Sequence, residues 1–77
     1  SPGVWFIYNG ERYKVLKAEI SNGSGSAGIV LDDYLEICCK DKSIKIIEIQ
    51  RQGKRPQNIN EFMLGSQIKK GSNLNNV

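Results

Sequence analysis

Histidine is absent from this 77-residue chain, and cysteine, proline and tryptophan are scarce, with two, two and one residues. Without histidine there is no Ser-His or Cys-His pair for nucleophilic catalysis. The two cysteines, Cys38 and Cys39, are adjacent, and two cysteines without histidine make a poor set of metal ligands. We therefore expect neither a metal site nor catalysis from these residues alone.

Long apolar segments are also missing. The longest purely apolar run, Val4–Tyr8, has five residues, which is too short for a membrane span or a signal-peptide core.

Neighbouring residues of a strand point to opposite faces, so Cys38 and Cys39 should not bridge each other. We expect one buried small side chain, one partly exposed thiol and a reducing, cytoplasmic location.

Positive charge is concentrated in the last third of the chain. Residues 1–50 carry six Lys/Arg and seven Asp/Glu, a net charge of −1, whereas residues 51–77 carry five and one, a net charge of +4. This asymmetry fits either an ordinary solvated surface or a one-sided field that attracts a polyanion.

The stretch 44–65 reads as a strand, a basic loop and a short helix. Its first part is rich in isoleucine, which suits a buried strand. Three cations then surround Gly53, and Pro56, which lacks an N–H, is expected to end the ladder pairing. Asn58 is expected to cap a helix together with Glu61, and Gly65 is a natural residue to stop it.

The first twenty residues predict a β-hairpin. Strands at Val4–Tyr8 and Glu11–Ile20 flank Asn9-Gly10, a sequence that favours a type I′ turn. The hydrophobic alternation of the second strand slips by one residue, and the isoleucines of the 44–49 strand show the same slip. A β-bulge near Val15-Leu16 restores one inner face, made of Tyr13, Val15, Leu16, Ala18 and Ile20.

The rest of the chain predicts short strands and turns. Strands are expected at Gly28–Leu31, at Leu35–Lys40 and, as an edge strand, at Gln67–Gly71, with a solvated turn at Asp32-Asp33. The loop before them contains a formal G-x-G-x-x-G, but a strand pattern follows it, whereas a dinucleotide site needs a helix there. The pattern as a whole predicts an all-β, small OB-like barrel of five to six strands with one short helix; a β-sandwich or an SH3-like barrel fits the same strand count.

Two groups of motifs point to a known family. The segments 46–56 and 61–65, together with 2–6, 9–15 and 17–18, match in order almost the whole length of a family domain. They resemble the C-terminal domain of methionyl-tRNA formyltransferases. The resemblance implies that residues 1–77 form one OB-like domain of a longer chain, with 1–3 as a linker end or cloning remnant and 73–77 as a frayed tail.

The resemblance also implies a function. In the family, an N-terminal Rossmann-like domain with an Asn/His/Asp set transfers the formyl group from 10-formyltetrahydrofolate, and the C-terminal barrel offers a positive face to the initiator methionyl-tRNA. The implied partners are that tRNA and the N-terminal domain, with no cofactor in the present residues. Two alternatives remain: a structural domain of a formyltransferase acting on a nucleotide sugar, and a free-standing OB-like interaction module.

The basic residues are the candidate tRNA contacts, because phosphate recognition needs only cations at backbone spacing. Arg12 and Lys45 are set apart, as guards of strand edges or partners of Glu11 and Glu48. The aromatic residues near the N-terminus are expected in the core and not on a stacking platform. The candidates, with the two strongest first, are Lys54, Arg55, Arg51, Lys14, Lys17, Lys40, Lys42, Lys69 and Lys70.

Overall fold

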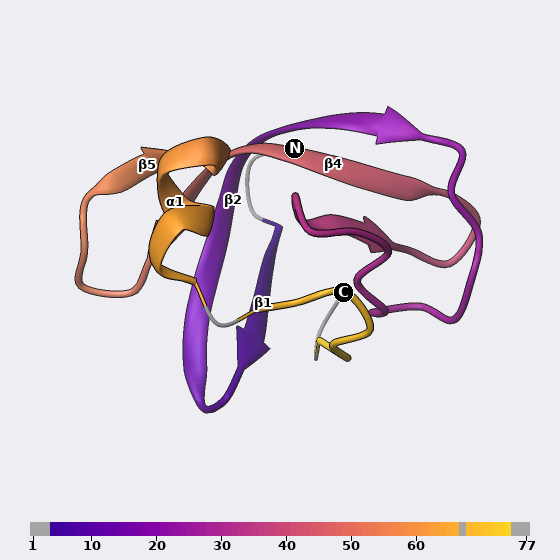
Figure 1. Cartoon of the computed structure of the whole chain (residues 1–77), viewed down its shortest axis with the longest axis horizontal. Helices are drawn as coiled ribbons and strands as arrows, with labels where there is room; N and C mark the ends of the chain where they lie inside the picture. Colours follow the sequence, from indigo (N-terminus) through magenta and orange to yellow (C-terminus); the bar gives the residue numbers. More distant parts are fainter. Residues whose placement is uncertain (1–3, 67, 75–77) are drawn as a thin grey trace.

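One curled antiparallel sheet carries the structure, a computed structural model that describes residues 4–66 and 68–74. Its strands run in the order β1-β2-β4-β3, and β5 pairs with β4. Figure 1 shows β4 running along the long axis, with the second half of β2 on one side of it and β3 on the other. The elements are β1 (Trp5–Tyr8), β2 (Glu11–Ser21), β3 (Glu36–Cys38), β4 (Ser43–Arg51), β5 (Pro56–Asn58) and the helix α1 (Ile59–Gly65). This confirms a small all-β, OB-like fold with one short helix.

The β1–β2 hairpin forms as predicted. Asn9 and Gly10 have φ angles of 51° and 77°, the pair of positive values that a type I′ turn requires. The pairing of β2 with β4 shifts register on both sides of Lys17, which confirms the bulge. Ile20 is nevertheless 74% exposed, so its inward assignment is wrong: it lies next to the end of β2, beyond the residues that β1 covers.

The β4 strand changes face as well. Ile46 and Ile49 are 2% and 0% exposed although they are three residues apart, and the register irregularity opposite Lys17 accounts for the extra residue. A strand that changes phase in this way bends, so that its two halves serve different parts of a barrel.

Two predictions about the late elements need correction. Pro56 does not end pairing with β4; it opposes Gln50 as the first residue of β5, a position at the start of an edge strand where the missing N–H is tolerated. Gly65 is the last residue of α1 and not the residue after it, because Ser66 is the extended C-cap. The start of the helix agrees with the prediction, since Asn58 Oδ1 accepts a hydrogen bond of 2.8 Å from the Glu61 N–H.

The C-terminal segment packs against residues 28–30. The Leu74 N–H donates to the Gly28 carbonyl and the Gly71 N–H to the Val30 carbonyl, both at 2.8 Å. Leu74 is 4% exposed, so the frayed tail is wrong for residues 73–74, while 1–3 and 75–77 lie outside the described residues. Gly28–Leu31 forms only isolated bridges, and 68–71 forms a turn in place of an edge strand.

The strand predicted at 35–40 is shortened to β3. Leu35 has a φ angle of 65°, which lies outside the β region and delays the start of the strand. Just before it, Asp32 Oδ1 accepts hydrogen bonds of 2.9 Å from the N–H groups of Tyr34 and Glu36. The Asp32-Asp33 pair therefore makes a turn, as predicted.

The glycine-rich loop is packed against the sheet. The Gly23 N–H donates to Ser43 Oγ at 2.8 Å, and this hydroxyl donates to Glu36 Oε2 at 2.5 Å. A Cβ on Gly23 would lie 2.5 Å from Leu31 Cδ1. The glycine is thus needed for close packing, and the formal G-x-G-x-x-G motif has a structural explanation.

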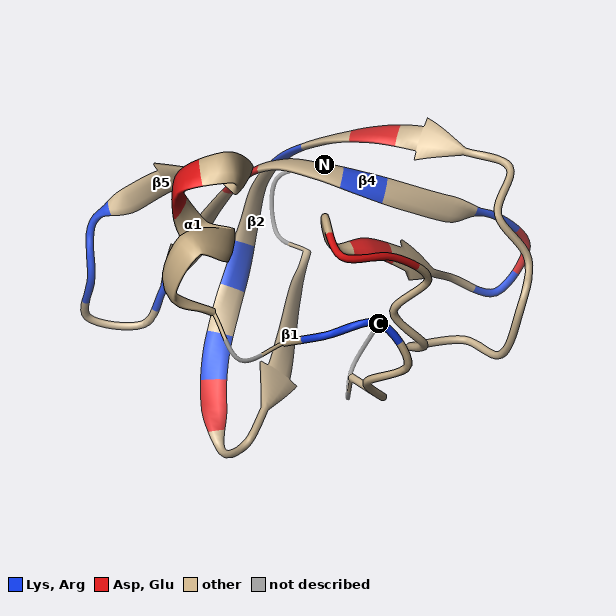
Figure 2. Ribbon diagram, viewed as in Figure 1, with Lys and Arg blue, Asp and Glu red and all other residues tan. Residues whose placement is uncertain are grey.

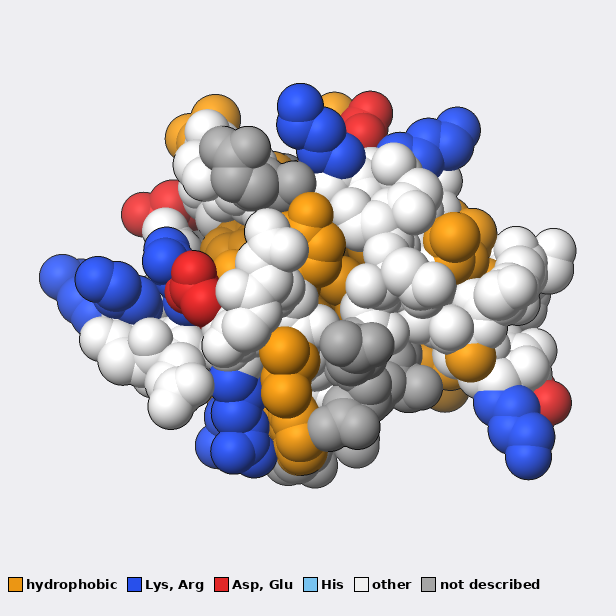
Figure 3. All heavy atoms as spheres, turned by 90° about the horizontal axis from the view of Figure 1, so that it is seen from below, with side chains coloured by type: hydrophobic (Ala, Val, Ile, Leu, Met, Phe, Trp, Pro, Cys, Tyr) orange, Lys and Arg blue, Asp and Glu red, His pale blue; other side chains and the backbone are white. Residues whose placement is uncertain are grey.

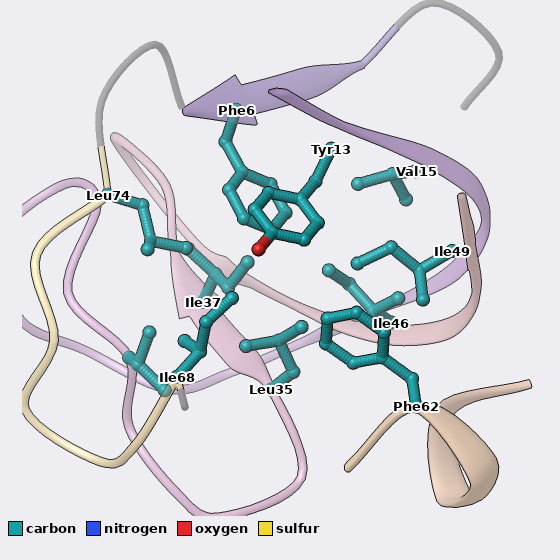
Figure 4. Close-up of a cluster of buried hydrophobic side chains, with 11 residues drawn as sticks. Phe6, Tyr13, Val15, Leu35, Ile37, Ile46, Ile49, Phe62, Ile68 and Leu74 are labelled. Carbon is teal, nitrogen blue, oxygen red and sulfur yellow. The ribbon is translucent and has the colours of Figure 1, made fainter. Parts of the chain in front are cut away.

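The core is continuous from the first hairpin to α1 and the C-terminal segment (Figure 4). Phe6 stacks on Tyr13 with ring centroids 5.0 Å apart, and Phe62 meets Tyr13 edge-on at 5.8 Å. Cys38 is buried and Cys39 partly exposed, as predicted from their neighbouring positions. The buried apolar cluster consists of Phe6, Tyr13, Val15, Val30, Leu35, Ile37, Ile46, Ile49, Phe62, Ile68 and Leu74.

Candidate nucleic-acid interface

The β4–β5 hairpin presents the two strongest candidate cations. The Lys54 N–H donates to the Arg51 carbonyl at 2.9 Å, and Gly53 supplies the positive φ angle, 75°, that the turn requires. The side chain of Gln50 donates through Nε2 to the Lys54 carbonyl at 3.0 Å. The Gln52 N–H donates to the Arg12 carbonyl at 2.9 Å and ties the loop to β2. The loop is therefore held both by its own hydrogen bonds and by β2, and Lys54 and Arg55 are exposed on it.

Arg51 is held by a carboxylate. Its Nε donates to Glu11 Oε2, and its Nη2 donates to Glu11 Oε1 at 3.0 Å. These hydrogen bonds, and then the negative charge of Glu11, raise the pKa of the Arg51 guanidinium. Both side chains are more than 40% exposed, at 44% and 43%, so water and salt screen the pair. Glu11 nevertheless offsets the charge that Arg51 can offer to a polyanion.

The outer face of β2 adds two cations beside this hairpin. Lys14 opposes Trp5 of β1 and Gln50 of β4, and residues directly opposite on antiparallel strands share a face. Arg12, two residues earlier, lies on the same face, and its guanidinium carbon is 4.1 Å from the centroid of the Trp5 ring. This is a cation–π contact.

Two hollows adjoin at this end of the molecule. A groove of about 960 Å³ lies between the β1–β2 turn, the β4–β5 hairpin and α1. A shallower hollow of about 560 Å³ lies on the outer face of β1, β2 and β4. Both are lined by Arg51 and Gly53. We call the five cations that line them, Arg12, Lys14, Arg51, Lys54 and Arg55, the hairpin-end surface.

Two carboxylates reduce the charge of the hairpin-end surface. Glu11 and Glu61 both line the groove. The five cations of the hairpin-end surface are therefore accompanied by two anions. The excess of three positive charges equals the net charge of the whole chain, +3. The other six Lys/Arg of the chain are matched in number by six Asp/Glu, so the excess positive charge of the chain equals that of this surface.

The other candidate cations lie elsewhere. Lys17 follows Lys14 on β2 but opposes Glu48 of β4. Lys40 and Lys42 flank Asp41 in the β3–β4 turn, at the opposite end of the 30 Å long axis from the β4–β5 hairpin (Figure 2). Lys69 begins a turn closed by the Ser72 N–H donating to its carbonyl at 2.9 Å, and Lys70 follows it.

The nine candidates therefore do not form one patch. Figure 3 shows separate groups of basic side chains around the outline of the molecule. The structure brings Arg51, Lys54, Arg55 and Lys14 together, leaves Lys17 outside both hollows opposite Glu48, and separates Lys40 and Lys42 from them along β4.

The sequence reasoning missed two residues at this site. Trp5 was expected in the core, but it is half-buried and lines the outer hollow with Arg12. Arg12 was set aside as an edge guard or a partner of Glu11, whereas Arg51 takes Glu11. A signal was available, because Asn9-Gly10 fixes the hairpin register, and that register puts Trp5 opposite Lys14.

Across residues 4–66 and 68–74, no group of three or more Cys, Asp or Glu side chains is placed to hold a metal ion. The same residues contain no helix that is long and apolar enough to cross a membrane.

Comparison with known proteins gives a consistent set of relatives. The family model described as "Formyl transferase, C-terminal domain" matches residues 1–67. The methionyl-tRNA formyltransferase of Pelagibacter ubique is 67% identical over 78 residues, which cover 100% of this chain and 25% of that protein. The methionyl-tRNA formyltransferase of Paramagnetospirillum magneticum is 47% identical over 73 residues, 95% of this chain and 24% of the relative.

A third relative, the methionyl-tRNA formyltransferase of Ruegeria pomeroyi, is 41% identical over 73 residues, again 95% of this chain and 24% of that protein. The chain thus spans about a quarter of the length of these relatives. Family model, relatives and OB-like fold agree, and the chain belongs to the formyl transferase C-terminal domain family.

Proposed function

We propose that this chain is the auxiliary tRNA-binding domain of a methionyl-tRNA formyltransferase. It holds the initiator methionyl-tRNA while a catalytic domain transfers the formyl group from 10-formyltetrahydrofolate, its substrate, in the cytoplasm. The observation that carries the proposal is the hairpin-end surface, five cations lining adjoining hollows, on a chain that matches methionyl-tRNA formyltransferases along its whole length.

The surface suits a folded RNA that is held by its backbone. Lys54 and Arg55 are exposed on a hairpin loop whose backbone is fixed by hydrogen bonds within the loop and to β2, so both cations are available to phosphates. Such contacts release counterions and set the orientation of the RNA without reading its sequence. The domain thereby contributes affinity and orientation, and the chemistry belongs to the catalytic domain.

The nine candidate cations fall into a primary and a secondary set. Lys54, Arg55, Arg51 and Lys14 make up the primary set, to which the structure adds Arg12, and Lys17 lies outside it. The secondary set consists of two separate pairs, Lys69 with Lys70 and Lys40 with Lys42. Each pair would contact another part of the RNA backbone or make no contact with the RNA.

A charge-reversal experiment tests the proposal. Lys54→Glu with Arg55→Glu is compared with Lys40→Glu with Lys42→Glu, which changes the net charge equally at the opposite end of β4. Each protein is titrated with initiator tRNA at several salt concentrations. The hairpin variant should bind at least about tenfold more weakly and lose roughly 1.4 to 1.8 from the log–log salt slope, the share of two phosphate contacts.

The control variant should lose clearly less of both quantities. Equal losses in the two variants would show that only net charge matters, and a wild-type slope near zero would refute phosphate binding by this chain.

A further inference from the structure

The shallow hollow on the outer face of β1, β2 and β4 contains more than phosphate-binding groups. Its lining combines one aromatic ring, three cations and two carboxamides: Trp5, Arg12, Lys14, Arg51, Gln50 and Gln52, beside Gly53. Phosphate binding needs only the cations. The ring and the carboxamides are the groups with which proteins bind exposed nucleobases, by stacking and by hydrogen bonds to the base edge.

The Trp5–Arg12 pair forms the floor of this site. The guanidinium carbon lies 4.1 Å from the centroid of the indole ring, while Arg12 itself is exposed. The guanidinium thus lies over the ring and is also accessible to solvent. Arginine planes, like aromatic rings, are surfaces on which unpaired bases stack.

Three polar side chains, Lys14, Gln50 and Gln52, line the hollow together with the Trp5–Arg12 pair. Lys14 opposes both Trp5 and Gln50 across the sheet, which puts a cation beside the floor. Gln50 uses its Nε2 to hold the Lys54 carbonyl, so its Oε1 is the atom left to accept from a base edge. Gln52 is exposed in the turn, and its carboxamide can both donate and accept.

We propose that this hollow binds one unpaired RNA base, stacked on the outer side of the Arg12 guanidinium, with Lys14 at its phosphate. The proposal rests on the proposed tRNA function and refines it. The β4–β5 hairpin grips the phosphate backbone, and the outer face holds a base from a loop or an end of the same folded RNA.

The single tryptophan of the chain gives a direct test, because a base stacked over the Trp5–Arg12 pair changes the indole fluorescence. The 77-residue chain is titrated with initiator tRNA and with a blunt-ended RNA duplex that has no unpaired base. We expect the tRNA to quench Trp5 fluorescence and the duplex to bind with little quenching.

Arg12→Lys then separates stacking from charge, because it keeps the positive charge and loses the planar group. It should weaken tRNA binding, followed by the anisotropy of labelled tRNA, by roughly 5- to 100-fold, the effect of one base stack, and leave the salt slope unchanged. Lys45→Arg is the control and should change neither, because Lys45 is exposed on β4 opposite Glu19 and Glu36, outside both hollows. Trp5→Leu should reproduce the loss; if it fails to fold, Arg12→Lys still decides.

Three results would overturn the inference while leaving the proposed function intact: salt-dependent tRNA binding that Arg12→Lys does not weaken, equal quenching by tRNA and duplex, or no quenching at all. The first of these would assign the hollow to another partner, such as a protein. Wild-type protein that binds no tRNA would overturn both the inference and the proposed function.

Discussion

Glu11 sets how much of the Arg51 charge is available at the hairpin-end surface. The two side chains are bound through two hydrogen bonds and remain open to solvent. Such an exposed pair contributes little to folding, because water and salt screen it. Its main effect falls on binding, because a phosphate has to compete with the carboxylate for the guanidinium.

Glu11→Gln should therefore strengthen tRNA binding. Removing the carboxylate frees Arg51 for one further phosphate contact, so the salt slope should steepen by roughly 0.7 to 0.9. Glu19→Gln is the matched control, since it makes the same charge change on β2 opposite Lys45, away from the hairpin end. An equal gain in both variants would mean that Glu11 acts only through net charge.

The ionisation of Tyr13 makes the stability of the folded protein depend on pH in the alkaline range. Burial, followed by the negative charge of Glu11, raises the pKa of its phenol. The folded protein therefore holds the phenolic proton at pH values where the unfolded chain has released it, so stability is lost as pH rises above about 10, the ordinary tyrosine value.

Tyr13→Phe should remove this loss. Urea unfolding at pH 9 and pH 11 should show a smaller fall in the free energy of unfolding for the variant than for the wild type. An identical fall in both proteins would assign the alkaline sensitivity to other groups.

Several residue-scale features could be predicted from the sequence because they depend on neighbours in the chain. The Asn9-Gly10 turn, the Asn58 cap and the opposite burial of Cys38 and Cys39 belong to this class. The exposure of Ile20 and the Trp5–Arg12 contact depend on where another strand ends or lies. No local pattern contains that information.

At the scale of elements, glycine has different roles in the β4–β5 hairpin and at the end of α1. Gly53 has a φ angle of 75° and open space around its Cα, whereas Gly65 ends α1 with open space and no positive φ. Neither glycine is required by packing, so only backbone conformation separates them.

Gly53→Ala should destabilise the protein by about 1 to 2 kcal/mol, the cost of a left-handed conformation for an L-residue, and weaken tRNA binding by disturbing the loop. Gly65→Ala should be neutral or stabilise by up to about 1 kcal/mol, because alanine is the better helix former. Thermal unfolding of the two variants checks this. Matching shifts in the same direction would contradict the assigned backbone roles.

The longer strands were predicted with the right phase because their hydrophobic pattern is long enough to show the bulge. The short ones were not. Pro56 opens β5 because it sits at a sheet edge. Residues 28–31 make only bridges, because their pairing is divided between Ile37 of β3 and Asn73 of the C-terminal segment. Such pairings are decided by the tertiary fold.

At the scale of the whole molecule, the C-terminal segment packs into the core of the barrel. Hydrogen bonds join residues 71–74 to residues 28–30, and Ile68 and Leu74 are 1% and 4% exposed in the core. A domain of this size has a modest core, so each of these side chains is a sizeable part of it.

Leu74→Ala should cost about 2 to 5 kcal/mol, the range for truncating a buried leucine, which approaches the total stability of a small domain. Leu64→Ala removes the same atoms from a side chain that is 90% exposed and should change stability by no more than about 0.5 kcal/mol. Denaturant unfolding of both variants would test this contribution. A small effect of Leu74→Ala would mean that the barrel does not need this segment.

Charge counting along the sequence located the basic end only in part. Lys54 and Arg55 ranked first because a loop bounded by Gly53 and Pro56 projects them with no acid nearby in the sequence, and these lie on the hairpin-end surface. Charge counting also grouped them with Lys40 and Lys42, which the nine residues of β4 hold at the other end of the long axis. The density of charge along the sequence does not say at which end of the molecule a basic side chain lies. The arrangement of the strands in the sheet determines this.

The loop between β4 and β5 is closed by hydrogen bonds within residues 50–54 and tied to β2 by the Gln52 N–H, which donates to the Arg12 carbonyl. Lys54 and Arg55 project from this fixed backbone and are exposed. Exchanging these two side chains should therefore change the strength of RNA binding without repacking the interior.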